Sequence, residues 1–193
     1  MSIVIGLAME NFIIMMSDGR VSKANTILKE DYKKLFRFNK NICIGFTGSQ
    51  DLCESILNEL SSIINEEIKL EQICDFLINS AIEKKNNIFI ADIFKCSFLI
   101  GGISDTNEII IYRFNSENNF ILEKMNSKGT ELSYNICSNT VDNKMFENFL
   151  RAKKICTSLQ EYVLLIEEFI DKVAKIDPSV NTNKYNEIIL FNV

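Results

Sequence analysis

The sequence contains no histidine. This absence excludes the Ser-His-Asp and Cys-His mechanisms, zinc sites that need histidine ligands, and most acid–base catalysis by imidazole. An enzyme with this sequence must therefore take its catalytic base from another group. We expect neither a cofactor nor a metal.

Long apolar runs and clusters of basic residues are also missing. No apolar run approaches the roughly 20 residues that span a bilayer, and the N-terminus lacks the basic segment and apolar core of a signal peptide. The net charge is −5 and the lysines are scattered, which gives no support for binding to nucleic acid. We therefore expect a cytoplasmic protein that binds neither membranes nor nucleic acid.

The six cysteines contain no C-x-x-C pair. Most of them lie within apolar segments, which favours buried, reduced thiols over a redox or metal site. The chain has 193 residues, of which 47% are hydrophobic, enough for a substantial core. With no linker or repeat in the sequence, we expect one domain over residues 1–193.

Apolar patterning predicts strands and helices in alternating blocks. The predicted strands are Ser2–Met9, Phe12–Ser17, Lys34–Phe38, Ile42–Thr47, Cys96–Ile103, Glu108–Phe114, Phe120–Met125, Leu132–Cys137 and Glu187–Val193. The predicted helices are Leu52–Ile64, Leu70–Ala81, Met145–Leu150 and Leu159–Val173. Ser49 suits the N-cap of the first helix, and Asp177-Pro178 ends the last one.

The order of these elements is strands, two helices, strands, two helices and a strand. The first two strands are too uniformly apolar for a sheet with one wet face, so we expect them to be buried on both sides. An α+β fold satisfies both observations: a four-layer αββα sandwich of two antiparallel sheets flanked by helix pairs. The abundant asparagines suggest no function.

Four polar features interrupt the apolar strands of the first third of the chain: Ser2, Asp18 with Arg20, Lys34 and Gly48. If Met1 is removed, the α-amine of Ser2 has a reference pKa of about 7.7–8.0 and can act as base toward its own hydroxyl. Lys34 would favour the deprotonated nucleophile, and Asp18 would orient Lys34. Taken singly, each residue is better explained as a surface or turn residue; the combination favours catalysis.

This segment resembles the proteasome β-subunit and bacterial HslV family of N-terminal nucleophile hydrolases. Counted from the nucleophile, the family has an aspartate 16 residues on, an arginine or polar residue 18 on, a lysine 32 on and an oxyanion glycine about 46 on. Without any gap, these positions fall on Asp18, Arg20, Lys34 and Gly48. The resemblance implies that the amide of Gly48 binds the oxyanion. The motif match covers residues 2–64, and the element order agrees beyond them.

The resemblance also implies supporting and specificity residues. The family has a serine in a loop before its third helix, which Ser138 matches without the flanking glycines, and an aspartate and serine after its fourth, which Asp177 and Ser179 match in poorer register. Val21 and Phe46 fall on positions that line the primary specificity pocket. Phe46 would make that pocket shallow, although core packing explains this residue equally well.

The function implied by the resemblance is amide hydrolysis, with peptides or unfolded proteins as substrates, in a homo-oligomeric ring to which an ATPase could deliver substrate. Serine replaces the family's threonine, and a free amine depends on removal of Met1. Two alternatives stay open: a catalytically inactive scaffold subunit of the same fold, and a small-molecule amidase.

Overall fold

The computed structural model describes residues 2–23, 26–63, 68–87, 95–127, 131–153 and 156–191. Its first sheet has four antiparallel strands in the order β10-β1-β2-β11. These strands are β1 (Val4–Met9), β2 (Phe12–Asp18), β10 (Ser133–Cys137) and β11 (Lys184–Leu190). All residues of β2 are buried, which confirms that this strand is covered on both faces.

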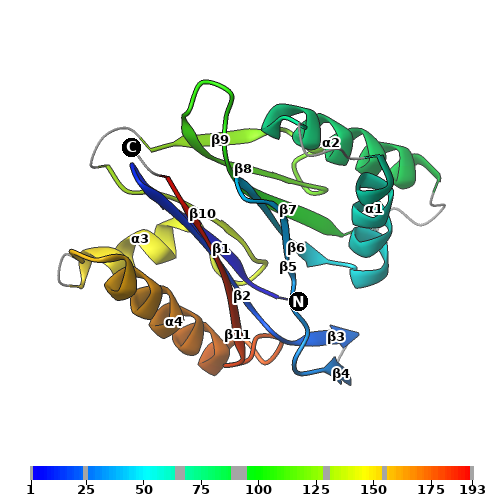
Figure 1. The fold of residues 1–193 in the computed structure, drawn as a ribbon. Coiled ribbons are helices and arrows are strands. Elements are labelled where there is room, and N and C mark those ends of the chain that lie inside the picture. The colour runs from blue at the N-terminus through cyan, green and yellow to red at the C-terminus, as the bar shows by residue number, and fades with distance from the viewer. Residues whose placement is uncertain are drawn as a thin grey trace.

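The second sheet has five antiparallel strands in sequence order. They are β5 (Leu35–Asn39), β6 (Ile42–Gly48), β7 (Cys96–Ile103), β8 (Ile109–Asn115) and β9 (Glu123–Asn126). One helix pair, α1 (Gln50–Ile63) and α2 (Leu70–Asn87), packs on this sheet, while α3 (Asn143–Arg151) and α4 (Leu159–Ile176) cover the first (Figure 1).

Three hydrophobic clusters fill the spaces between the four layers. One lies between α1–α2 and the second sheet, one between α3–α4 and the first sheet, and one between the two sheets. Alternation along β2 supplies two of them, since Ile14 and Met16 face α4 whereas Ile13 and Met15 face the other sheet. The predicted αββα sandwich is confirmed.

The two sheets approach each other closely at Gly45. A Cβ atom at this position would lie 2.6 Å from Cγ1 of Val4 on the facing sheet, so a larger residue would push the layers apart. Val4 begins β1, and Gly45 lies in the middle of β6, three residues before Gly48. This contact therefore sets the separation of the two sheets close to the predicted catalytic residues.

Several element boundaries differ from the sequence predictions. A hairpin of β3 (Val21–Lys23) and β4 (Thr26–Lys29) was not predicted, because the residues of β4 are all exposed and show no apolar alternation. Strand β9 begins at Glu123, after Phe120 has adopted a left-handed φ of 61°. Strand β11 begins at Lys184, before the predicted apolar residues.

Two further predictions concern the whole chain. No helix among the described segments is long and apolar enough to cross a membrane. That residues 1–193 form one domain stays a prediction.

Candidate active site

Asp18 and Lys34 form a buried ion pair at one end of the sandwich. Asp18 is the last residue of β2, and Lys34 immediately precedes β5. Lys34 Nζ lies 2.6 Å from Asp18 Oδ1 and also donates to the Asp18 carbonyl oxygen at 3.1 Å. The side chains are 2% and 0% exposed respectively, so water screens the pair little. The sequence-predicted partnership of these residues is present in the structure.

Ser2 directly precedes Ile3, which is hydrogen-bonded to Asp18 of this pair. The amide of Ile3 donates to Asp18 Oδ1 at 3.0 Å, and the amide of Asp18 donates to the carbonyl of Ile3 at 3.3 Å. Ser2 itself is 8% exposed. The carboxylate that holds the ammonium of Lys34 therefore also fixes the backbone next to the candidate nucleophile.

Burial affects the acid–base properties of Lys34. Loss of hydration lowers the pKa of its ammonium group, while the charge and hydrogen bond of Asp18 oppose the shift. The net direction is downward. Lys34 thus supplies a cation whose proton is held less tightly than in water, and Asp18 limits this effect.

Gly48 occupies an exposed, conformationally special position. Its φ is +111°, and a Cβ atom there would lie 2.2 Å from the carbonyl oxygen of Lys95. Glycine is therefore required at this position. Upstream on β6, the amide of Phe46 donates to the carbonyl of Lys34 at 3.3 Å. Gly48 follows Phe46 by two residues, so β6 brings it near the ion pair. Helix α1 starts at Gln50, directly after the predicted cap residue Ser49.

Arg20 holds the turn after Asp18 in place. Its amide donates to Asp18 Oδ2 at 3.0 Å, and its guanidinium makes two hydrogen bonds of 3.0 Å with Glu30. The guanidinium also donates to the carbonyl of Pro178. Arg20 therefore connects the Asp18 turn to the loop that carries Asp177 and Ser179. These contacts are structural, and the supporting role of Arg20 in catalysis stays a prediction.

Asp177 is the centre of a second polar group. Its Oδ1 accepts from the amide of Ser179 at 2.8 Å and from the hydroxyl of Ser179 at 2.5 Å, while its Oδ2 accepts from the hydroxyl of Thr140. Burial raises the pKa of Asp177, but hydrogen bonds from Ser179 and Thr140 outweigh it and hold the pKa below the ordinary value. The carboxylate is therefore ionised at neutral pH.

Ser138 reaches this group indirectly. Its hydroxyl accepts from the amide of Thr140 at 3.2 Å, and it is Thr140 that bonds to Asp177. Sequence reasoning missed Thr140, as well as Asn181, which accepts from the amide of Gly19 at 2.9 Å. The family resemblance points to Ser138, Asp177 and Ser179 but not to Thr140 or Asn181, so the contacts of these two residues were not visible without the tertiary structure.

The two predicted pocket residues are both buried. Phe46 packs against Phe36, Tyr32 and Phe98, with ring centroids 6.0 to 6.4 Å apart. Val21 begins β3 and is 9% exposed. The core-packing explanation for Phe46 thus has direct support, and the shallow pocket stays a prediction. Among the described residues, no group of three His, Cys, Asp or Glu side chains could hold a metal ion.

The fold and this polar site define an αββα protein of the N-terminal nucleophile hydrolase type. The chain matches the family described as proteasome subunit over residues 2–184, and it therefore belongs to that family. It is 39% identical over 72 residues to the ATP-dependent protease subunit HslV of Rickettsia typhi and of Rickettsia prowazekii. Each match covers 37% of this chain and only 36% of the relative.

Solved structures share the fold at low sequence identity. Anbu, an ancestral beta-subunit from Yersinia bercovieri, has a TM-score of 0.74 at 14% identity, over 97% of this chain and 81% of that chain. HslV from Trypanosoma brucei has a TM-score of 0.64 at 13% identity, over 97% of this chain and 99% of that chain. These likenesses confirm the predicted fold class.

Proposed function

We propose that this chain is an amide hydrolase, and specifically a peptidase, whose nucleophile is the hydroxyl of Ser2 after removal of Met1. The observation that carries the proposal is the buried pair of Asp18 and Lys34, bonded to the Ile3 amide beside Ser2. Removing two charges from water costs several kcal/mol per ion, so burial of this ion pair brings no gain in stability over an ion pair at the surface. A catalytic role explains why the pair lies at this place.

In the proposed reaction, the α-amine of Ser2 takes the hydroxyl proton while Oγ bonds to the substrate carbonyl carbon. The carbonyl electron pair moves to oxygen, and the amide of Gly48 donates to this oxyanion. When the pair returns, the C–N bond breaks and the leaving amine takes the proton from the ammonium of Ser2. Water then attacks the ester in the same way, which releases the acid and restores the hydroxyl.

The residues around this centre have distinct proposed roles. Lys34 stabilises the negative charge that develops on Oγ, and Asp18 holds Lys34 in position. Arg20, Ser138, Asp177 and Ser179 support the surrounding loops and the terminal amine. Val21 and Phe46 are proposed to bound a shallow specificity pocket.

We further propose that the protein works as a homo-oligomeric ring on peptide or unfolded-protein substrates. The names of the relatives support protease activity and self-assembly: the HslV proteins are ATP-dependent protease subunits, and the Anbu complex of Pseudomonas aeruginosa forms a helical assembly. The closed ring is proposed from the family resemblance. An ATPase partner is the corresponding proposal for substrate delivery.

The test combines N-terminal sequencing of protein from its native host with a covalent probe that needs both a hydroxyl and a free α-amine. We expect a chain that begins at Ser2 and is labelled, with no labelling of the Ser2→Ala variant. Retained Met1, or a processed chain that resists the probe, would favour the scaffold alternative. Cleavage of acyl-amino-acid amides but not of peptides would favour the small-molecule amidase.

A further inference from the structure

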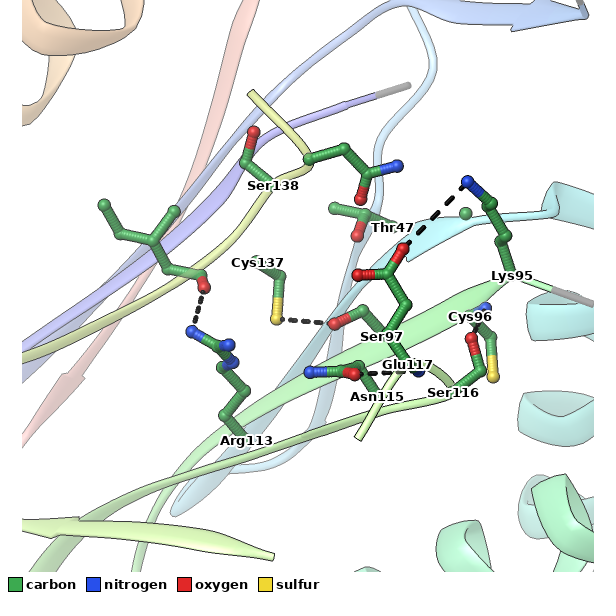
Figure 2. Close-up of a pocket in the computed structure, with 13 residues that line it drawn as sticks. Thr47, Lys95, Cys96, Ser97, Arg113, Asn115, Ser116, Glu117, Cys137 and Ser138 are labelled. Carbon is green, nitrogen blue, oxygen red and sulfur yellow. Dashed lines mark hydrogen bonds and ion pairs between the residues drawn. The ribbon is translucent and has the colours of Figure 1, made fainter. Parts of the chain in front are cut away.

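A cavity of about 60 Å³ opens between the ends of the two sheets. Ser97 of β7 and its strand partner Asn115 of β8 line it, together with Arg113, which lies two residues before Asn115 and on the same face of β8. Cys137 at the end of β10 covers the cavity from the other sheet (Figure 2). The polar groups of these residues determine what the cavity can hold.

Two side-chain amides beside the cavity have an orientation that their hydrogen bonds fix. The oxygen of Asn115 accepts from two backbone amides of the following turn, at 2.9 and 2.8 Å. The oxygen of Asn135, a fully buried residue of β10, accepts from Arg113 and from Asn143, each at 3.1 Å. Only the oxygen of an amide side chain can accept, so in both residues the opposite, nitrogen end is the free one.

Buried donors at this place lack acceptors. Among the described residues, Nδ2 of Asn135 is buried without a hydrogen-bond partner, and so is Nε of Arg113. The carboxylate of Glu123 lies 3.5 Å from this Nε but is not hydrogen-bonded to it. Buried N–H groups without an acceptor are rare in folded proteins, because each costs free energy, and a bound group that accepts hydrogen bonds is one explanation.

Two more donors border the same cavity. Nδ2 of Asn115 has no acceptor in the part of the chain that the structure describes, and Figure 2 shows it turned away from Glu117, toward Cys137 and Arg113. The hydroxyl of Ser97 has two poor acceptors, the sulfur of Cys137 at 3.2 Å and a backbone carbonyl at 3.5 Å. The cavity is therefore rich in donors and poor in acceptors.

The carboxylates near the cavity lie at its exposed rim. Glu123 is 36% exposed, and Glu117 is 69% exposed and 4.0 Å from the ammonium of Lys95. Figure 2 shows the side chains of Glu117 and Lys95 pointing toward each other. Water screens these charges more than it screens buried groups. The excess of donors, rather than a net positive charge, is thus what distinguishes the interior.

We propose that this cavity binds a small inorganic anion such as chloride, held by Arg113, Asn115, Asn135 and Ser97. One anion accepts several hydrogen bonds at once and would give each of these donors an acceptor. A water molecule accepts at most two, and it would bring two further hydrogens into a cavity that already has too many donors. The volume suits an ion about the size of one or a few water molecules.

The test is a chloride titration followed by chlorine NMR, which requires no turnover and therefore does not depend on the proposed function. The full-length protein is titrated with sodium chloride at constant ionic strength, with gluconate, a larger anion, as the balancing ion. We expect saturable broadening of the chloride resonance with a midpoint on the order of 10 mM, because about three hydrogen bonds of modest net strength correspond to that affinity. Bromide should compete.

Two variants probe the donors. Arg113→Gln removes the charged donor and should weaken binding about tenfold or more, whereas Ser97→Ala removes one neutral donor and should weaken it about fivefold. Circular dichroism checks that each variant is folded. If Arg113→Gln is unfolded, Ser97→Ala decides the question, since it only truncates a small side chain.

Arg37→Gln is the matched control. Arg37 lies on β5 of the same sheet, and it also donates to backbone carbonyls and lies near a glutamate, Glu187, at 3.8 Å. This variant should bind chloride as the native protein does. Broadening that increases without saturation, or a saturable signal that persists unchanged in Ser97→Ala and in folded Arg113→Gln, would overturn the anion site.

Discussion

Replacement of Lys34 by methionine tests whether the ion pair at the candidate site is as buried as the structure indicates. The change keeps an apolar chain of similar length but leaves the Asp18 carboxylate without its charge partner. Among the described residues, the amides of Ile3 and Arg20 would then be the remaining hydrogen-bond donors to this carboxylate. Removal of one member of a buried pair costs about 3–5 kcal/mol of unfolding free energy.

This cost should be visible as a large fall in melting temperature. For a chain of this size each kcal/mol shifts Tm by about 2–4 °C, so Lys34→Met should lower Tm by about 6–20 °C. Denaturant unfolding at one fixed protein concentration provides the free energy, since assembly makes stability depend on concentration. The double variant Asp18→Asn/Lys34→Met carries no charge at either position of the pair and should recover at least about 2 kcal/mol relative to the sum of the single changes.

Lys33→Met is the control for this experiment. Lys33 is adjacent in sequence but 45% exposed, and it pairs with Glu187 at the surface, so its loss should cost at most about 1 kcal/mol. Equal effects of the Lys33 and Lys34 variants, or strict additivity in the double variant, would refute the burial argument. Loss of activity in Lys34→Met without loss of stability would leave a catalytic role but not a buried pair.

Three other predictions follow from the same site and its surroundings. Gly48→Ala should lower the unfolding free energy by at least about 1–3 kcal/mol, measured in urea, and should abolish labelling of Ser2, since its Cβ would meet the Lys95 carbonyl at 2.2 Å. The difference in unfolding free energy between the native protein and Asp177→Asn should be constant from pH 7 to about pH 5. Because the folded pKa of Asp177 lies below its ordinary 3.8, the stability that its carboxylate contributes should begin to fall as the pH approaches 3.8 and should be lost once the pH has fallen through the lowered folded pKa. Alkylation of the folded protein at pH 7.5, followed by mass spectrometry, should modify Cys156 first, because burial raises the pKa of Cys137 to about 11 and of Cys43 and Cys96 to about 12; early modification of any of these three would contradict it.

The layers could be predicted because burial is encoded locally in the sequence. Strand β2 is apolar from Phe12 to Met16, which indicates a strand covered on both faces, and the helices repeat apolar residues at helical spacing. The pair of Asp18 and Lys34 was predicted for a different reason: the spacing of both residues from Ser2 matches, without insertions, that of the family which the sequence resembles. The contact between them is present in the structure, whereas its catalytic role stays a proposal.

The loops at the same end of the sandwich could not be predicted in this way. Their contacts depend on how the loop between β10 and α3 packs against the loop after α4, and no periodic pattern in the sequence indicates this packing. Thr140, rather than Ser138, therefore bonds to Asp177 without any local signal. The hairpin of β3 and β4 was missed because exposed strands bury no apolar face.

The asparagines show what such non-periodic positions contribute. Asn181 accepts from the Gly19 amide and donates to the carbonyl and carboxylate of Glu30, so one buried side chain joins three backbone or side-chain groups. Asn135, fully buried in the middle of β10, differs from Asn181: its oxygen accepts from Arg113 and Asn143, but its side-chain nitrogen has no partner among the described residues. An amide side chain can donate and accept at once without carrying charge, which suits buried loop ends that contain both unpaired N–H and C=O groups. Asn181 therefore has a structural explanation: it is a neutral cross-link between the loop after α4 and the residues Gly19 and Glu30, next to the candidate site.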